Sequence, residues 1–296
     1  MLKMGFNEGC TWDGNRGCAD QSLMADLENC VKYGFKGIDI RFDCLAKYLE
    51  EGGTLEELNA YMKANDIVPL SYNALCFFNM KQTEEEKKAV MDELDDIIAK
   101  CAALDCHMVV VVPSFDLAEK NIHATRQEIK ADAVAVLKEM VKKCEPTGLK
   151  LSLEFCGAPT MSINTFDDAY EIVKAVDSPL VGVTLDQYHF HAMGSTWDAL
   201  EAADGEKIFV WHLNDMEDLP CGAAYNTDAK RLWPSDPRGC LDHKRYADTL
   251  KKIGYDFENG FITMEVFRPD YYELSTEENI KTAAEETARH IQRFCK

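Results

Sequence analysis

The amino-acid sequence predicts an α/β fold, a (β/α)8 or TIM barrel formed by a single domain over residues 1–296. Short β-rich runs alternate with longer amphipathic stretches, which is the pattern of βα units. Eight such runs recur at intervals of roughly 30 to 40 residues, which fits a closed barrel better than an open sheet. No Gly-rich phosphate loop follows the first run, and no linker rich in Pro, Ser or Gly interrupts the alternation.

Several of the expected strands, such as MVVVV at 108–112, are continuously apolar, as parallel strands covered on both faces must be. The expected strands cover residues 3–10, 37–42, 68–74, 107–113, 150–156, 181–186, 208–214 and 261–267. The stretches between them have helical periodicity. The expected helices cover residues 22–33, 55–65, 84–104, 126–144, 166–176, 197–203, 243–253 and 276–294. The longest irregular stretch, about 216–242, follows the seventh strand, and a loop of that length is usually functional.

The composition excludes several classes of partner. Acidic residues outnumber basic ones 52 to 32, which gives a net charge of -20 and argues against nucleic acid, whose binding depends on Lys and Arg. No apolar run approaches the roughly 18 residues that a membrane span needs, and the N-terminus has no signal-peptide pattern. The twelve cysteines are scattered without a CxxC pair, so a reduced, cytoplasmic protein is expected.

Ionisable residues mark the ends of four successive strands, where the active site of a parallel barrel lies. They are Glu154 in KLSLEFCG, Asp186 in VGVTLDQYHFH, His212 in IFVWHLNDMED and Glu265 in GFITMEVFRP. A single acid at a strand end is commonly a helix cap or half of a salt bridge, but three converging carboxylates repel each other unless a cation lies between them. The pattern therefore predicts one divalent metal. This oxygen-rich set favours Mn²⁺, with Co²⁺, Mg²⁺ and Zn²⁺ left open.

Four motifs carry a resemblance to a known family. The segments E-F-C-G, D-x-x-H, H-L-N-D and M-E-V-F-R-P-D-Y-Y occur in this order and resemble the xylose-isomerase-like superfamily of sugar isomerases and epimerases. The resemblance covers essentially the whole chain. The C-terminal segment GYDFENGFITMEVFRPDYYELS is most similar to the inosose (2-keto-myo-inositol) isomerases of that superfamily.

The resemblance implies roles for particular residues. The four strand-end residues match the metal ligands, and two of them, Glu154 and Glu265, also match the pair that moves protons in related epimerases. Substrate contacts are implied for His189, Arg231 and Arg268. The segment PSDPRGCLD is longer than the P-G-x-G-x-I-D turn of relatives and lacks its first glycine.

The expected function is a metal-dependent isomerase or epimerase of a small keto-sugar or keto-inositol, which acts by proton transfer through an enediolate. No phosphate cradle is evident, which favours unphosphorylated substrates. A lyase or dehydratase of such substrates begins with the same proton removal and remains an alternative reaction. This alternative includes catalytic subunits that cleave C-glycosides together with a small partner subunit. A homo-oligomer is a further alternative for the assembly. An apurinic endonuclease is disfavoured because its extra metal-ligand positions hold Asn73, Ser114 and the segment DAK at 228–230.

Overall fold

Eight parallel strands form a closed barrel in the computed structural model, which describes residues 1–296, and this confirms the predicted fold class. The strands neighbour one another in the order β1-β10-β7-β6-β5-β4-β3-β2, with β2 returning to β1. Their bounds are β1 (Lys3–Asn7), β2 (Gly37–Arg41), β3 (Val68–Cys76), β4 (Met108–Val112), β5 (Lys150–Glu154), β6 (Val181–Asp186), β7 (Ile208–Leu213) and β10 (Phe261–Met264).

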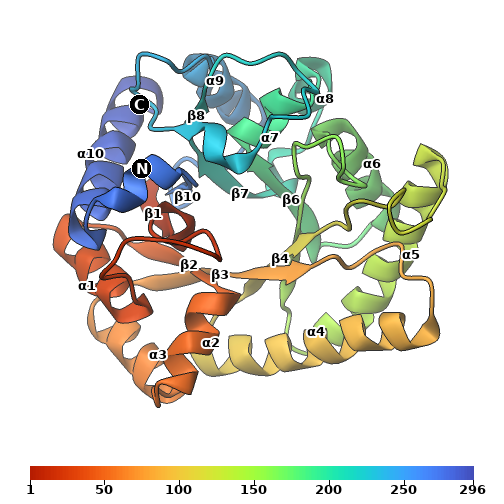
Figure 1. Cartoon of the computed structure of the whole chain (residues 1–296), viewed down its shortest axis with the longest axis horizontal. Helices are drawn as coiled ribbons and strands as arrows, with labels where there is room; N and C mark the ends of the chain where they lie inside the picture. Colours follow the sequence, from red (N-terminus) through yellow and green to blue (C-terminus); the bar gives the residue numbers. More distant parts are fainter.

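Helices surround the barrel (Figure 1) and cover the outer faces of its strands. Their bounds are α1 (Leu23–Tyr33), α2 (Phe42–Glu50), α3 (Leu55–Ala64), α4 (Glu84–Leu104), α5 (Arg126–Cys144), α6 (Phe166–Val176), α7 (Gln187–Ala192), α8 (Trp197–Glu201), α9 (His243–Ile253) and α10 (Thr276–Phe294). None of them combines the length and apolarity that a membrane crossing would need.

Three short elements lie outside the predicted pattern. Helices α2 and α7 begin directly at the ends of β2 and β6, inside segments expected to be strand or loop. The stretch after β7 contains a two-stranded antiparallel sheet of β8 (Asp215–Met216) and β9 (Arg231–Leu232). The first strand also ends earlier than expected, because the Asn7 side chain accepts a hydrogen bond from the backbone of Gly9 and starts a 3-10 turn.

Two glycines, Gly5 of β1 and Gly37 of β2, have close neighbours in the barrel. A Cβ atom on Gly5 would lie 2.4 Å from Thr263 Oγ1, and one on Gly37 would lie 2.6 Å from Leu70, so neither position accepts a side chain without movement of its neighbours. Side chains of a strand alternate between its faces, and Asp39 therefore shares the interior face with Gly37. Asp39 itself is fully buried in the middle of β2.

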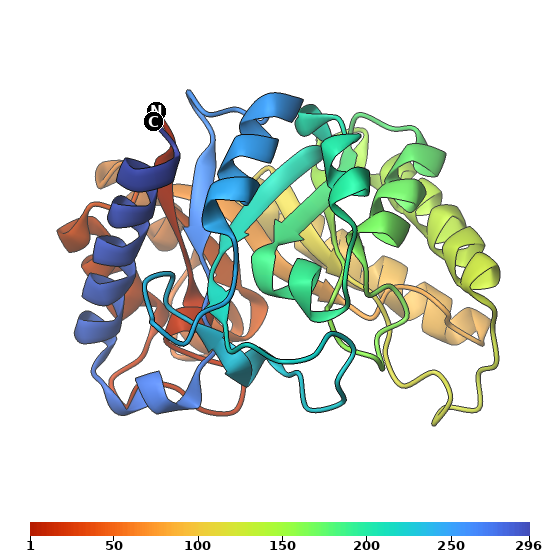
Figure 2. The same ribbon diagram turned by 90° about the horizontal axis from the view of Figure 1, so that it is seen from above.

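The two ends of the barrel differ in what they carry. Figure 2 shows the termini side by side at the end where the strands begin, and the segment after β7 at the opposite end. At the first end the Met1 ammonium group donates a hydrogen bond to Glu258 O at 2.6 Å. The carboxyl ends of the strands, which the sequence marks with ionisable residues, lie at the other end beneath the long loop.

Candidate metal centre

The structure brings together the four residues that the sequence singled out at strand ends. Glu154 and Asp186 are the last residues of β5 and β6, His212 lies in β7, and Glu265 directly follows β10. One ligand atom from each lies within 4.8 Å of all the others. The four side chains are almost completely buried, with Asp186 and His212 at 0% exposure.

His212 lies at the centre of the cluster. Its Nδ1 atom is 3.3 Å from Glu154 Oε1, 3.1 Å from Glu265 Oε2 and 3.8 Å from Asp186 Oδ2. One nitrogen and three carboxylates facing a common point form a donor set that suits a hard or borderline divalent cation. The residues present therefore fit a single divalent metal.

The surroundings of Glu265 and Asp186 shift the pKa values of these two carboxyl groups in opposite directions. Burial, with a contribution from Glu154, raises the pKa of Glu265 to about 7, although His212 and Arg231 oppose the shift. Burial also acts to raise the pKa of Asp186, but the Arg231 guanidinium, together with nearby histidines, outweighs it and lowers that pKa. Asp186 is thus held as a carboxylate, whereas Glu265 lies closer to a balance between its two forms.

Arg231 of β9 reaches into the cluster from the long loop. Its Nη1 atom donates to Glu265 Oε2 at 3.1 Å and to Asp186 Oδ2, and its Nη2 atom lies 3.1 Å from His189 Nε2. The guanidinium is 1% exposed. Two of the three predicted substrate-contacting residues therefore lie side by side next to the ligands.

His189 is oriented by the backbone. Its Nδ1 atom accepts a hydrogen bond from Gly157 N at 2.9 Å, which turns Nε2 towards Arg231. Arg268 points elsewhere. Its Nη1 atom donates to Glu217 Oε1 at 2.9 Å and to the Arg231 carbonyl at 3.2 Å, so this side chain supports the loop that carries Arg231. A direct substrate contact by Arg268 stays a prediction.

Sequence reasoning missed two residues that hold the ligands. Asn214 Nδ2 donates to Asp186 Oδ2 at 2.8 Å and to the Glu265 carbonyl at 3.2 Å, which ties β6, β7 and the end of β10 together. Asp39 Oδ2 lies 3.2 Å from His212 Nε2. The available signals were the alternation of strand faces, which places Asn214 with His212, and an acid in the apolar strand GIDIR.

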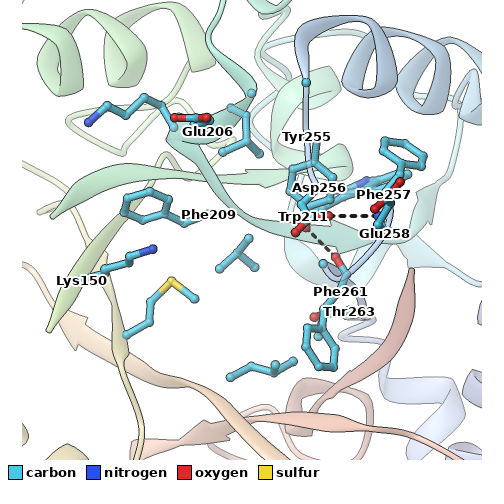
Figure 3. Close-up of a pocket in the computed structure, with 18 of the residues that line it drawn as sticks. Lys150, Glu206, Phe209, Trp211, Tyr255, Asp256, Phe257, Glu258, Phe261 and Thr263 are labelled. Carbon is cyan, nitrogen blue, oxygen red and sulfur yellow. Dashed lines mark hydrogen bonds between the residues drawn. The ribbon is translucent and has the colours of Figure 1, made fainter. Parts of the chain in front are cut away.

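A large cavity lies away from this centre, at the end of the barrel where the strands begin. It has a volume of about 870 Å³ and is lined by aromatic residues that include Phe209, Tyr255 and Phe261 (Figure 3). Its inner wall includes Asp39 and Thr263. In barrels of this kind the reacting groups lie at the opposite end, so we place the functional site at the buried cluster rather than in this cavity.

Comparison with known proteins agrees with the geometry. The family model described as xylose isomerase-like TIM barrel matches residues 27–294. The inosose isomerase of Halalkalibacterium halodurans is 40% identical over 293 residues, which cover 99% of this chain and 97% of that protein. The inosose isomerase of Bacillus velezensis is 39% identical over 294 residues, which cover 99% and 98%. A crystal structure of the IOLI protein with a bound zinc atom superposes with a TM-score of 0.90 at 38% identity and covers 99% of both chains.

Proposed function

The chain belongs to the xylose isomerase-like TIM barrel family, and we propose that it is a divalent-metal-dependent isomerase of a keto-inositol such as 2-keto-myo-inositol. Two inosose isomerases are about 40% identical to it over nearly their whole length. The observation that carries the proposal is the buried cluster of three carboxylates and one imidazole, whose ligand atoms lie within 4.8 Å of one another.

We assign the metal to Glu154, Asp186, His212 and Glu265. A bound divalent cation would stabilise the negative charge that develops on substrate oxygens when a proton leaves the neighbouring carbon. Because three of the four donors are carboxylates, we propose Mn²⁺ as the metal used, although the related IOLI protein was crystallised with zinc.

The proton is moved by this chain's own carboxylates. Glu154 is the last residue of β5 and Glu265 directly follows β10, and these two strands are separated by β6 and β7 in the barrel. A substrate held between them therefore meets one carboxylate on each side, so that one can remove a proton and the other can return one. Both are almost completely buried, and this limits proton exchange with bulk water.

His189 and Arg231 are suited to hold substrate oxygens. Their facing nitrogen atoms are 3.1 Å apart, and both lie beside the ligands. Arg231 supplies a cation that is permanently charged. Because His189 Nδ1 accepts a hydrogen bond from Gly157 N–H, the ring carries its proton on Nε2 and can donate it to a substrate oxygen. We propose that they orient the hydroxyl and carbonyl groups of the substrate, and that Arg268 acts through the loop of Arg231.

Proton NMR in D₂O, with Mn²⁺-loaded protein and 2-keto-myo-inositol, tests the proposal. We expect deuterium to enter the substrate at a carbon next to the carbonyl and an isomeric inosose to accumulate without loss of water. A product that has lost water would identify the lyase reaction instead. The absence of both exchange and turnover with Mn²⁺, Co²⁺, Mg²⁺ and Zn²⁺ would contradict the proposed activity.

A further inference from the structure

The buried carboxylate of Asp39, in the middle of β2, contacts His212 of the cluster. Asp39 is 0% exposed, and its Oδ2 atom lies 3.2 Å from His212 Nε2. Its other oxygen, Oδ1, accepts a hydrogen bond from the Ser71 hydroxyl at 2.7 Å. Both oxygens of Asp39 are therefore engaged, one by an imidazole nitrogen and one by a hydroxyl group that fixes the plane of the carboxylate.

The two ring nitrogens of His212 face different surroundings. Nδ1 faces Glu154 and Glu265 at 3.3 Å and 3.1 Å, whereas Nε2 faces Asp39 alone. A neutral imidazole carries one proton, and an ionised carboxylate can only accept hydrogen bonds. Carboxylates thus face both nitrogens, and Nδ1 is the one directed at the proposed metal. If a metal takes the lone pair of Nδ1, the ring proton resides on Nε2, where Asp39 Oδ2 can accept it.

We propose that Asp39 is the positioning residue of the metal centre, which fixes the tautomer and the ring orientation of His212 so that Nδ1 binds the metal. This inference rests on the metal site of the proposed function. A carboxylate buried in the interior of a barrel is costly unless it is paired, and Asp39 has His212 as its ionisable partner.

Asp39 also separates the metal centre from the large cavity at the other end of the barrel. The residues that line the cavity include Asp39, whose Oδ2 atom contacts His212. The carboxylate is thus the boundary between the cavity and Nε2 of the ligand. A substitution that keeps its volume, Asp39→Asn, preserves this boundary and changes only its charge and hydrogen bonding.

Titration of the metal-free whole protein with Zn²⁺, in competition with a chelator, tests the role of Asp39. We expect one Zn²⁺ per chain in the wild type and a Kd that is about 10- to 100-fold weaker for Asp39→Asn, as for other groups that orient a metal-binding histidine. Ser152→Ala is the matched control, because Ser152 is a buried polar residue of the barrel that bonds to Thr184 and makes no hydrogen bond with His212. It should bind Zn²⁺ as tightly as the wild type.

The possible outcomes separate the role of Asp39 from the metal site itself. Wild-type affinity in Asp39→Asn, or an equal loss in Ser152→Ala, would overturn the role of Asp39 while leaving the metal site intact. A wild type that binds no Zn²⁺ would overturn the metal site as well. If Asp39→Asn does not fold, ¹⁵N NMR of the histidines in the Zn²⁺-loaded wild type shows which ring nitrogen of His212 carries the proton. We expect the His212 proton on Nε2, and a proton on Nδ1 would overturn the inference.

Discussion

The three carboxylates of the cluster differ in the groups that hold them. Asp186 is contacted by the Arg231 guanidinium and by the Asn214 amide, and its pKa is lowered. Burial raises the pKa of Glu265 to about 7. The Arg231 guanidinium, which contacts Asp186, also donates a hydrogen bond to Glu265. Neighbouring carboxyl groups whose surroundings push their pKa values apart are suited to different tasks: Asp186 to a ligand that stays ionised, and Glu265 to a ligand that can also exchange a proton.

Replacing either proposed proton carrier by its amide tests this division of roles. Glu154→Gln and Glu265→Gln keep the size of the side chain and one oxygen but remove the base. We expect each to lower turnover by about 10² or more while the barrel stays folded. Steady-state rates and solvent-deuterium exchange are the measurements. Glu258→Gln, an exposed change at the other end of the barrel, should leave both unchanged. If either site variant keeps a near-normal rate of solvent-deuterium exchange, that residue does not move the proton and acts only as a ligand.

At the scale of elements, α7 explains the spacing of the D-x-x-H motif. Asp186 is the N-cap of this helix, and its Oδ1 atom accepts a hydrogen bond from the backbone N–H of His189 at 2.8 Å. An N-cap side chain commonly bonds to the residue three positions later. The same hydrogen bond therefore fixes the carboxylate of Asp186, whose Oδ2 atom faces the cluster, and places His189 beside it.

The eight barrel strands and the four clustered residues could be predicted because each has a local signal in the chain. An apolar run marks each strand, and an ionisable residue marks the end of each of the last four strands. Asp39 could not be assigned a partner in the same way, because His212 lies 173 residues later and meets it only when the barrel closes. Helix α2 was missed because it begins at Phe42, within a run that reads as the end of a strand.

Two further buried acids, Asp26 of α1 and Glu8 of the turn after β1, lie outside the candidate metal centre. Asp26 and Glu8 are both 0% exposed, and the Asp26 carboxylate accepts a hydrogen bond from Gln21 at 2.8 Å. Burial raises the pKa of Asp26 from 3.8 to about 7, and burial together with Asp26 raises that of Glu8. Both groups are therefore more easily protonated in the folded chain than in the unfolded one.

The sign of the pH dependence follows from these shifts. The contribution of Asp26 to stability is fully present below its unfolded pKa and is lost as the pH rises through its folded pKa of about 7. Asp26→Asn should therefore stabilise the protein relative to the wild type more at pH 8 than at pH 5, by on the order of a few kcal/mol. Urea unfolding at the two pH values measures this difference. The exposed change Asp248→Asn should show no such dependence, and a gain in Asp26→Asn that is equal at both pH values would contradict the prediction.

At the scale of the whole molecule, the long loop after β7 lies against the candidate metal centre. Its two short strands place Arg231 against the cluster, and the Arg268–Glu217 ion pair of 2.9 Å fastens the loop to the segment after β10. Arg238, the residue of the PSDPRGCLD segment that could contact a phosphate, is paired instead with Asp236 at 2.7 Å. The loop thus brings one cation, Arg231, into contact with the site residues.

The charge around the centre argues for an uncharged substrate. Glu154, Asp186 and Glu265 face the site, and Asp228 lies 3.0 Å from Arg231, so four acidic groups surround one arginine and one proposed dication. The chain as a whole carries a net charge of -20, which adds no compensating positive field. A phosphate group would bring roughly two further negative charges into these surroundings. Its repulsion should exceed what a single arginine can offset.

We therefore expect kcat/KM to be clearly higher for 2-keto-myo-inositol and other free keto-sugars than for their phosphorylated counterparts. Steady-state assays with matched pairs of substrates, at fixed ionic strength, measure the preference directly. Raising the salt concentration should narrow the gap, because screening weakens repulsion between charges. A phosphorylated substrate that is preferred would contradict the electrostatic argument. In that case Arg238→Ala tests whether Arg238 binds the phosphate. Loss of the preference for the phosphorylated substrate in this variant would mean that Arg238 leaves Asp236 to bind the phosphate.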